Sequence, residues 1–107
     1  MADISLVEPL IRELREHYDV VDDELIRRAF TVADKAHQGQ LRKSGEEYIT
    51  HPVAVSEILA QLGLNTTTVV ASLLHDTVED TPYSLEQLRN DFGDEVANLV
   101  DGVTKLD

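Results

Sequence analysis

Apolar residues recur at intervals of three and four along most of this chain, which predicts a succession of helices. A first helix is expected over residues 6–17, where Pro9 lies in the first turn and is therefore tolerated. A second helix is expected to follow a cap at Asp22 or Asp23 and to end at Gly39. Its apolar stripe consists of Leu25, Ile26, Ala29, Phe30, Ala33 and Ala36.

A polar connection over residues 38–50 separates these two helices from the rest of the chain. After it, Pro52 suits the first position of a third helix, which is expected to run to Leu62 and to be capped by Gly63. Asn65 is expected to open a fourth helix. The threonines and valines that follow it also favour a strand, so capping and propensity point in different directions here.

Two further helices are expected in the last part of the chain. Ser84 and Gln87 make a capping box for a short fifth helix, which Gly93 closes. A sixth helix is expected to start near Asp94 and to continue to the end of the sequence. Its apolar positions are Val96, Leu99, Val100 and Val103. Because no repeat or Pro/Gly-rich linker interrupts these elements, they predict one all-α domain over residues 1–107.

The formal net charge of −12 argues against a nucleic acid or a membrane surface as a partner, since both attract basic surfaces. No apolar run approaches the ~20 residues that span a bilayer, and the N-terminal residues lack the features of a signal peptide. The absence of cysteine excludes disulfides and thiolate metal sites, so we expect a cytoplasmic protein. Arg42 and Lys43 form a small basic island, which either receives one anionic ligand or is simply solvated.

One segment, ASLLHDTVEDT, places His75, Asp76, Glu79 and Asp80 directly after an apolar run. Unpaired buried charge is costly, so these groups must face water, pair with one another or share a cation. Together with His51, at the expected start of the third helix, His75 and Asp76 offer two imidazoles and one carboxylate. This donor set suits a divalent transition metal such as Mn, Fe or Zn.

Glu79 and Asp80 each follow a metal-ligand candidate by four residues, which places them on the same helix face if the helix continues. In that position their carboxylates would orient or deprotonate a water molecule whose acidity a cation raises. The alternative is that the two residues only end the helix before Thr81. The spacing is compatible with both interpretations.

Three longer stretches give the chain a recognisable signature: AHQGQLRKSGEEYITHPVAV, LLHDTVEDT and FGDEVANLVDGVTKL. They resemble the hydrolase domain of the RelA/SpoT homologue family, within the HD superfamily of metal-dependent phosphohydrolases. The resemblance covers nearly all of residues 24–106 and implies an HD-domain helical bundle. It also implies an enzyme that removes the 3′-pyrophosphate from the guanosine polyphosphates ppGpp and pppGpp.

The resemblance implies roles for the histidines and acids singled out above. His51, His75 and Asp76 match the metal ligands of the family, which usually hold Mn²⁺, although another divalent metal is compatible with them. Glu79 and Asp80 match the acidic pair that positions the attacking water.

Arg42, Lys43 and Ser44 match the loop that holds the nucleotide, with Arg42 packed on the guanine base. His37 belongs to a family motif as well, and we expect it to have a structural place at a helix end.

One departure concerns a further aspartate ligand, which the family carries in a later segment that residues 1–107 do not contain. We therefore expect this sequence to be the N-terminal portion of a (p)ppGpp hydrolase domain, incomplete at its C-terminus. By itself it is expected to bind Mn²⁺ weakly, to hydrolyse ppGpp poorly and to self-associate through apolar surface on the fourth and sixth helices. The alternatives are a non-catalytic nucleotide-sensing or interaction module, and an HD phosphohydrolase of another nucleotide.

Overall fold

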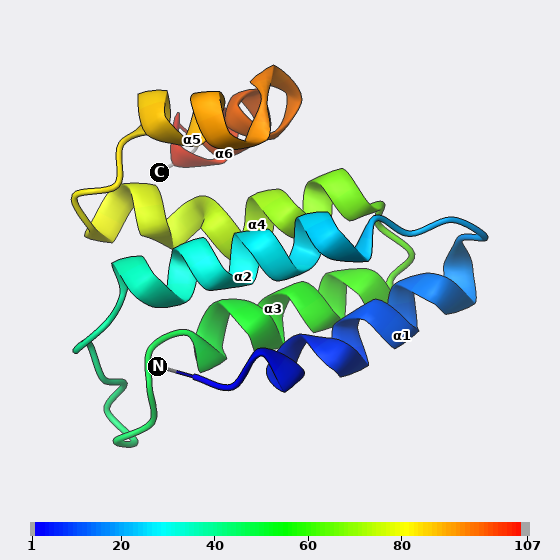
Figure 1. Cartoon of the computed structure of the whole chain (residues 1–107), viewed down its shortest axis with the longest axis horizontal. Coiled ribbons are helices and arrows are strands. Elements are labelled where there is room, and N and C mark those ends of the chain that lie inside the picture. The colour runs from blue at the N-terminus through cyan, green and yellow to red at the C-terminus, as the bar shows by residue number, and fades with distance from the viewer. Residues whose placement is uncertain (1, 106–107) are drawn as a thin grey trace.

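The computed structural model describes residues 2–105, which form six α-helices and one 3₁₀ turn (Figure 1). The elements in chain order are η1 (Ile4–Val7), α1 (Glu8–His17), α2 (Asp23–Ala36), α3 (Thr50–Gln61), α4 (Thr66–Asp80), α5 (Leu85–Phe92) and α6 (Asp94–Lys105). Within the described residues, extended pairing is limited to one antiparallel bridge between Leu41 and Glu47. The predicted all-α class is confirmed.

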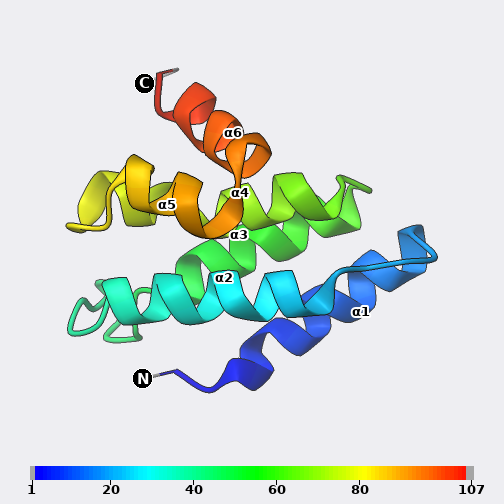
Figure 2. The ribbon, with the colours of Figure 1, turned by 45° about the horizontal axis from the view of Figure 1, so that its top comes forward.

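Helix α4 is the central element of the fold and packs against α2, α3 and α6. Helix α1 packs on the outer side of α3, and α5 packs against α6. In both ribbon views α5 and α6 lie on one side of α4, while α1 lies at the opposite side of the molecule (Figures 1 and 2). This arrangement leaves the last turn of α4 at the surface while its middle is enclosed.

The apolar part of α4 is buried, so the expectation of uncovered apolar surface on the fourth helix was wrong. Its enclosed side chains are Val69, Val70, Ala71, Leu73 and Leu74. Three neighbouring helices cover them, which the sequence pattern of α4 alone does not reveal. The same expectation is confirmed for α6, where Leu99 and Val103 are 37% and 44% exposed. Ile58 on α3 and Leu62, which caps the end of that helix, are also exposed.

Side-chain caps set the starts of α2 and α4. The carboxylate of Asp22 accepts a hydrogen bond from the Leu25 amide at 3.1 Å, so Asp22 rather than Asp23 caps α2. The side chain of Asn65 accepts from the Thr68 amide at 2.9 Å, which confirms the expected start of α4. A local hydrogen bond and the packing of the apolar face thus prevail over the strand propensity of the residues that follow.

Three helix boundaries differ from the expected ones by at least two residues, and the first is the start of α1, which lies at Glu8 instead of residue 6 because a 3₁₀ turn precedes it. Helix α2 ends at Ala36 instead of Gly39, because His37 already caps it, and Gly39 (φ +89°) lies in the turn beyond. Helix α3 begins at Thr50, two residues before Pro52. The amide of Thr50 donates to the Glu47 carbonyl at 3.1 Å, so a preceding turn continues into the helix. Proline is still tolerated there because the first-turn amides have no partner within the helix.

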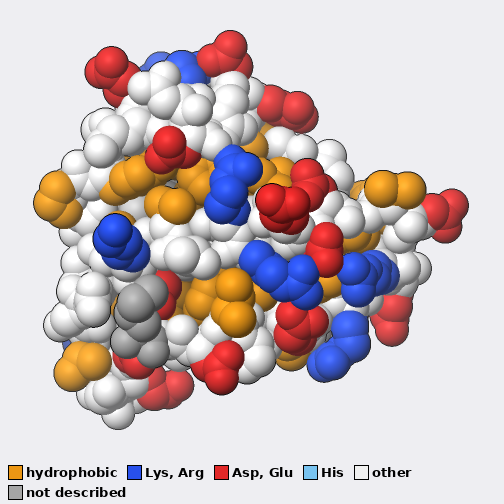
Figure 3. All heavy atoms as spheres, viewed as in Figure 1, with side chains coloured by type: hydrophobic (Ala, Val, Ile, Leu, Met, Phe, Trp, Pro, Cys, Tyr) orange, Lys and Arg blue, Asp and Glu red, His pale blue; other side chains and the backbone are white. Residues whose placement is uncertain are grey.

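The surface carries the excess of negative charge in a dispersed form. Figure 3 shows Asp and Glu side chains spread over one face and mixed with Lys and Arg. No helix within residues 2–105 combines the length and the apolar character needed to cross a membrane. The capping box of α5 is present as expected, with the side chains of Ser84 and Gln87 each accepting a backbone amide of the other.

Candidate metal centre

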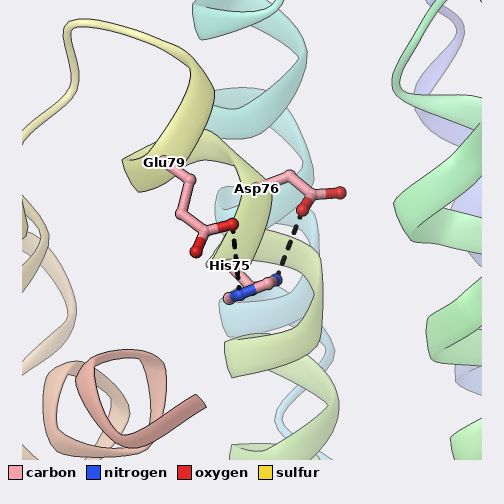
Figure 4. A group of neighbouring side chains, drawn as sticks. All are labelled: His75, Asp76 and Glu79. Atoms are coloured by element: carbon pink, nitrogen blue, oxygen red, sulfur yellow. Dashed lines mark ion pairs between the residues drawn. The ribbon is translucent and has the colours of Figure 1, made fainter. Parts of the chain in front are cut away.

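The last two turns of α4 bring three potential metal ligands together. One ligand atom from each of His75, Asp76 and Glu79 lies within 4.8 Å of the others (Figure 4). The Nδ1 atom of His75 lies 3.3 Å from Asp76 Oδ1, and its Nε2 atom lies 3.5 Å from Glu79 Oε2. All three side chains are about one-quarter exposed. The prediction that His75 and Glu79 share a helix face is confirmed.

The donor set of this cluster fits a divalent cation. A neutral imidazole carries a single N–H, yet carboxylate oxygens lie close to both ring nitrogens of His75. His75 Nε2 is buried and makes no hydrogen bond, although Glu79 Oε2 lies 3.5 Å away. A nitrogen lone pair among carboxylates is a favourable environment for a metal ion such as Zn²⁺ or Mn²⁺.

Tyr48 is a site residue that sequence reasoning missed. It lies at the end of the α2–α3 connection, and its hydroxyl donates to Asp76 Oδ2 at 3.1 Å. Burial, followed by the negative charge of Asp76, raises the pKa of the Tyr48 hydroxyl to about 12. The hydroxyl therefore keeps its proton near neutral pH and remains a hydrogen-bond donor. The only signal in the sequence is an aromatic residue three positions before His51, inside an otherwise polar connection.

His37 fastens the α2–α3 connection to α4, which confirms its expected structural place at a helix end. The amide nitrogen of Gln40 donates to the Asp80 carbonyl at 3.5 Å, so the amide oxygen faces His37 Nδ1 at 3.1 Å. This orientation places the ring proton on Nδ1. The other nitrogen, Nε2, then accepts from the buried Thr77 hydroxyl at 3.3 Å. The ring of His37 also packs against that of Tyr48, with centroids 4.6 Å apart.

The basic island forms a tight, exposed turn. The Gly45 amide donates to the Arg42 carbonyl at 2.9 Å, and Lys43 and Ser44 lie at the tip between them. The Arg42 guanidinium donates to Thr50 Oγ1 at 3.3 Å, at the first residue of α3.

The connection that carries this turn reaches the acidic end of α4, because the Gln40 side-chain amide donates to the Asp80 carbonyl at 3.5 Å. The pKa of the Tyr48 hydroxyl is raised by the charge of Asp80 and lowered by that of Arg42. Both charges therefore act on one hydroxyl group that is itself bonded to Asp76.

Not all of the predicted site residues belong to the cluster. His51 lies in the first turn of α3, half-buried, with its ring 6.0 Å from the Tyr48 ring in an edge-on contact. It is not in the group of three ligand atoms, whereas Glu79, expected as a catalytic acid or base, is in that group. Asp80 is exposed at the last position of α4. The three potential ligands of the cluster thus come from one helix, and His51 lies on the neighbouring one.

A hollow of about 250 Å³ lies beside His75, between α3, α4 and α6. Its walls are mostly apolar and include Val55, Leu59 and Leu99. A larger hollow of about 480 Å³ is lined by Lys35, Tyr83 and neighbouring residues, and none of the predicted site residues lines it. The predicted site residues therefore gather at the polar end of α4 and not at this larger hollow.

The fold is helical, and its central helix ends in His75–Asp76 followed by Glu79 and Asp80. This combination is the one that a comparison with known families has to explain. Residues 29–107 match a family model described as an HD domain, and the chain belongs to this family. It is 59% identical over 102 residues to a probable GTP pyrophosphokinase of Mycobacterium leprae. It is also 62% identical over 76 residues to a guanosine-3′,5′-bis(diphosphate) 3′-pyrophosphohydrolase of Haemophilus influenzae. The RelA/SpoT resemblance of the motifs is confirmed.

A third relative is the bifunctional (p)ppGpp synthase/hydrolase RelA of Mycobacterium tuberculosis, 60% identical over 102 residues. These alignments cover 95%, 71% and 95% of the chain in the order given. The chain spans only 11 to 14% of the length of these relatives. The names of these relatives include both synthase and hydrolase activities, so membership of the family does not by itself assign one activity to this chain.

Proposed function

We propose that residues 1–107 are the N-terminal portion of a hydrolase domain that removes the 3′-pyrophosphate from ppGpp and pppGpp, in the cytoplasm. The observation that carries this proposal is the cluster of His75, Asp76 and Glu79, which Tyr48 joins to the connection that carries an exposed basic turn. A phosphate-rich nucleotide needs positive charge for binding, and its hydrolysis needs groups that handle water. The cluster and the turn supply these two requirements next to one another. A synthase that only transfers pyrophosphate would not require this histidine and carboxylate set.

A divalent cation, with Mn²⁺ as our first choice, fits the site through His75 and Asp76, and His51 would complete the set from α3. Such an ion supplies Lewis acidity toward phosphoryl oxygens and toward water. The match of these three residues to the family's ligands supports this assignment, as does the buried, hydrogen-bond-free Nε2 atom of His75.

The acids at the end of α4 are assigned the proton transfers. Water adds to the phosphorus attached to the 3′ oxygen while the bond between that oxygen and phosphorus breaks. Glu79 or Asp80 accepts the proton from water, and a proton is returned to the departing 3′ oxygen. The products are pyrophosphate with GDP from ppGpp, or with GTP from pppGpp. Glu79 has a second assignment open to it, because its carboxylate already lies among the potential ligands.

Product analysis tests this proposal directly. The chain, in excess over ppGpp so that a single slow turnover is visible, is incubated with Mn²⁺, and the nucleotides are separated by anion exchange. We expect GDP and pyrophosphate to form, and the reaction to stop when EDTA removes the metal. Binding of ppGpp without products would favour a non-catalytic sensing module. Equal turnover of ordinary nucleotides would favour an HD phosphohydrolase of another substrate.

We expect the substitution Arg42→Ala to weaken ppGpp binding by about 1–2 kcal/mol while Mn²⁺ affinity stays nearly unchanged. A guanidinium stacked on a base and paired with phosphate contributes energy of this order. The measurement is calorimetric titration of a non-hydrolysable ppGpp analogue and, separately, of Mn²⁺. The matched control is Arg12→Ala, which removes the same charge from an exposed position on α1. Equal nucleotide affinity in the two variants would contradict the role of Arg42.

A further inference from the structure

Tyr48 makes backbone, ring and hydroxyl contacts, although it belongs to a largely exposed connection. Its amide donates to the Gln40 carbonyl at 3.1 Å, and its ring packs between the rings of His37 and His51. His37 is in turn held to α4 through Thr77. The tyrosine side chain is therefore held in position by residues of both neighbouring helices, and its hydroxyl points at an ionisable group.

That ionisable group is the Asp76 carboxylate, and both of its oxygens have a neighbour. Oδ2 accepts the Tyr48 hydroxyl at 3.1 Å, while Oδ1 lies 3.3 Å from His75 Nδ1. Without the hydroxyl, the Asp76 carboxylate would lose the hydrogen bond on Oδ2 that opposes its rotation. Repulsion from the nearby acids Glu79 and Asp80 would also favour turning the carboxylate toward water. A donor on Oδ2 thus keeps Oδ1 aimed at the imidazole.

We propose that Tyr48 is a positioning residue that orients the Asp76 carboxylate for metal binding, with its ring held in place by His37. This inference rests on the metal site in the proposed function. It gives the α2–α3 connection two tasks: its tip carries the basic turn and its end sets one metal ligand. Hydrogen-bond partners of metal ligands typically contribute 10–100-fold to metal affinity or activity.

The test compares two tyrosines that each bond an aspartate. Tyr83 lies beyond the end of α4 and donates to Asp91 Oδ2 on α5 at 2.5 Å instead of to Asp76, so Tyr83→Phe is the matched control. Calorimetric titration with Mn²⁺ alone is expected to show about 10-fold weaker binding for Tyr48→Phe and unchanged binding for Tyr83→Phe. Both variants keep the aromatic ring and lose one hydroxyl. A purely structural role would lower the melting temperature of Tyr48→Phe without changing its Mn²⁺ affinity.

A second measurement uses the unmodified chain, so it does not depend on the folding of a variant. The sequence contains three tyrosines, and ¹³C at the ring carbon bearing the hydroxyl reports each of them separately. Because paramagnetic broadening falls steeply with distance, substoichiometric Mn²⁺ is expected to broaden the Tyr48 signal before and more strongly than those of Tyr18 and Tyr83.

The outcomes separate the inference from the function on which it rests. No Mn²⁺ binding by the wild-type chain would overturn both the metal site and the role of Tyr48. Mn²⁺ binding that is equal in Tyr48→Phe and Tyr83→Phe would overturn the inference alone. A Tyr48 signal that stays sharp while Mn²⁺ binds would do the same, because the ion would then lie away from Asp76.

Discussion

Replacing Glu79 with glutamine is expected to reduce ppGpp hydrolysis by about 10²–10⁴-fold, the usual contribution of general acid–base assistance. The amide has nearly the size of the carboxylate and still forms hydrogen bonds, but it cannot accept a proton at neutral pH. Substrate binding should persist, because the basic turn around Arg42 is untouched. The measurement is the single-turnover rate with ppGpp and Mn²⁺, accompanied by the affinity for a non-hydrolysable analogue.

The control for this experiment is Glu16→Gln, which neutralises an exposed glutamate on α1. Helix α1 packs against α3 and η1. It lies on the other side of the molecule from the end of α4 (Figure 1). We expect wild-type turnover in this control. Near wild-type turnover in Glu79→Gln as well would show that Glu79 only ends the helix. Weaker Mn²⁺ binding in Glu79→Gln would instead identify Glu79 as a metal ligand, as its position among the ligand atoms allows.

Substitution of His75 by alanine is expected to weaken Mn²⁺ binding by at least ~100-fold. Losing a hydrogen-bond partner of a ligand costs 10–100-fold, and losing the ligand itself removes a coordinating atom as well. Metal that binds only the folded state stabilises it, by about 2.7 kcal/mol when present at 100 times its dissociation constant. The rise in melting temperature on adding Mn²⁺ should therefore disappear in His75→Ala.

His17→Ala is a close match for this comparison. His17 lies on α1 with Glu13 Oε1 3.8 Å from its Nε2, so it also pairs with a glutamate four residues away. The quantity compared is the difference between melting temperatures with and without Mn²⁺, in which any intrinsic loss of stability cancels. A Mn²⁺ effect that survives in His75→Ala would place the metal elsewhere in the chain.

Much of the fold follows from short-range features that the sequence displays directly. Asp22 and Asn65 cap their helices through amides three residues away, and Ser84 pairs with Gln87 over the same distance. These contacts form within one turn, so they depend little on the rest of the molecule. The pairing of His75 with Glu79 has the same origin, because helical geometry places residues four apart on one face.

Other features depended on contacts between distant segments, and the sequence pattern did not predict them. Tyr48 reaches Asp76 across 28 positions, and His37 reaches Thr77 across 40. Such pairs exist only after α2, α3 and α4 have packed together, since packing sets the separation between helices. For the same reason, the spacing of apolar residues within α4 did not predict that three other helices cover its apolar face.

By itself, therefore, the sequence determined the number of helices, the caps at Asn65 and Ser84 and the acidic end of α4, because these are set by hydrogen bonds and spacings within a few residues. Tertiary structure decided which side chains surround that end. It placed Tyr48 on Asp76, brought the charge of Arg42 near the same hydroxyl and left His51 outside the closest group of ligand atoms. These outcomes depend on distances between separate helices and a loop, which no local pattern encodes.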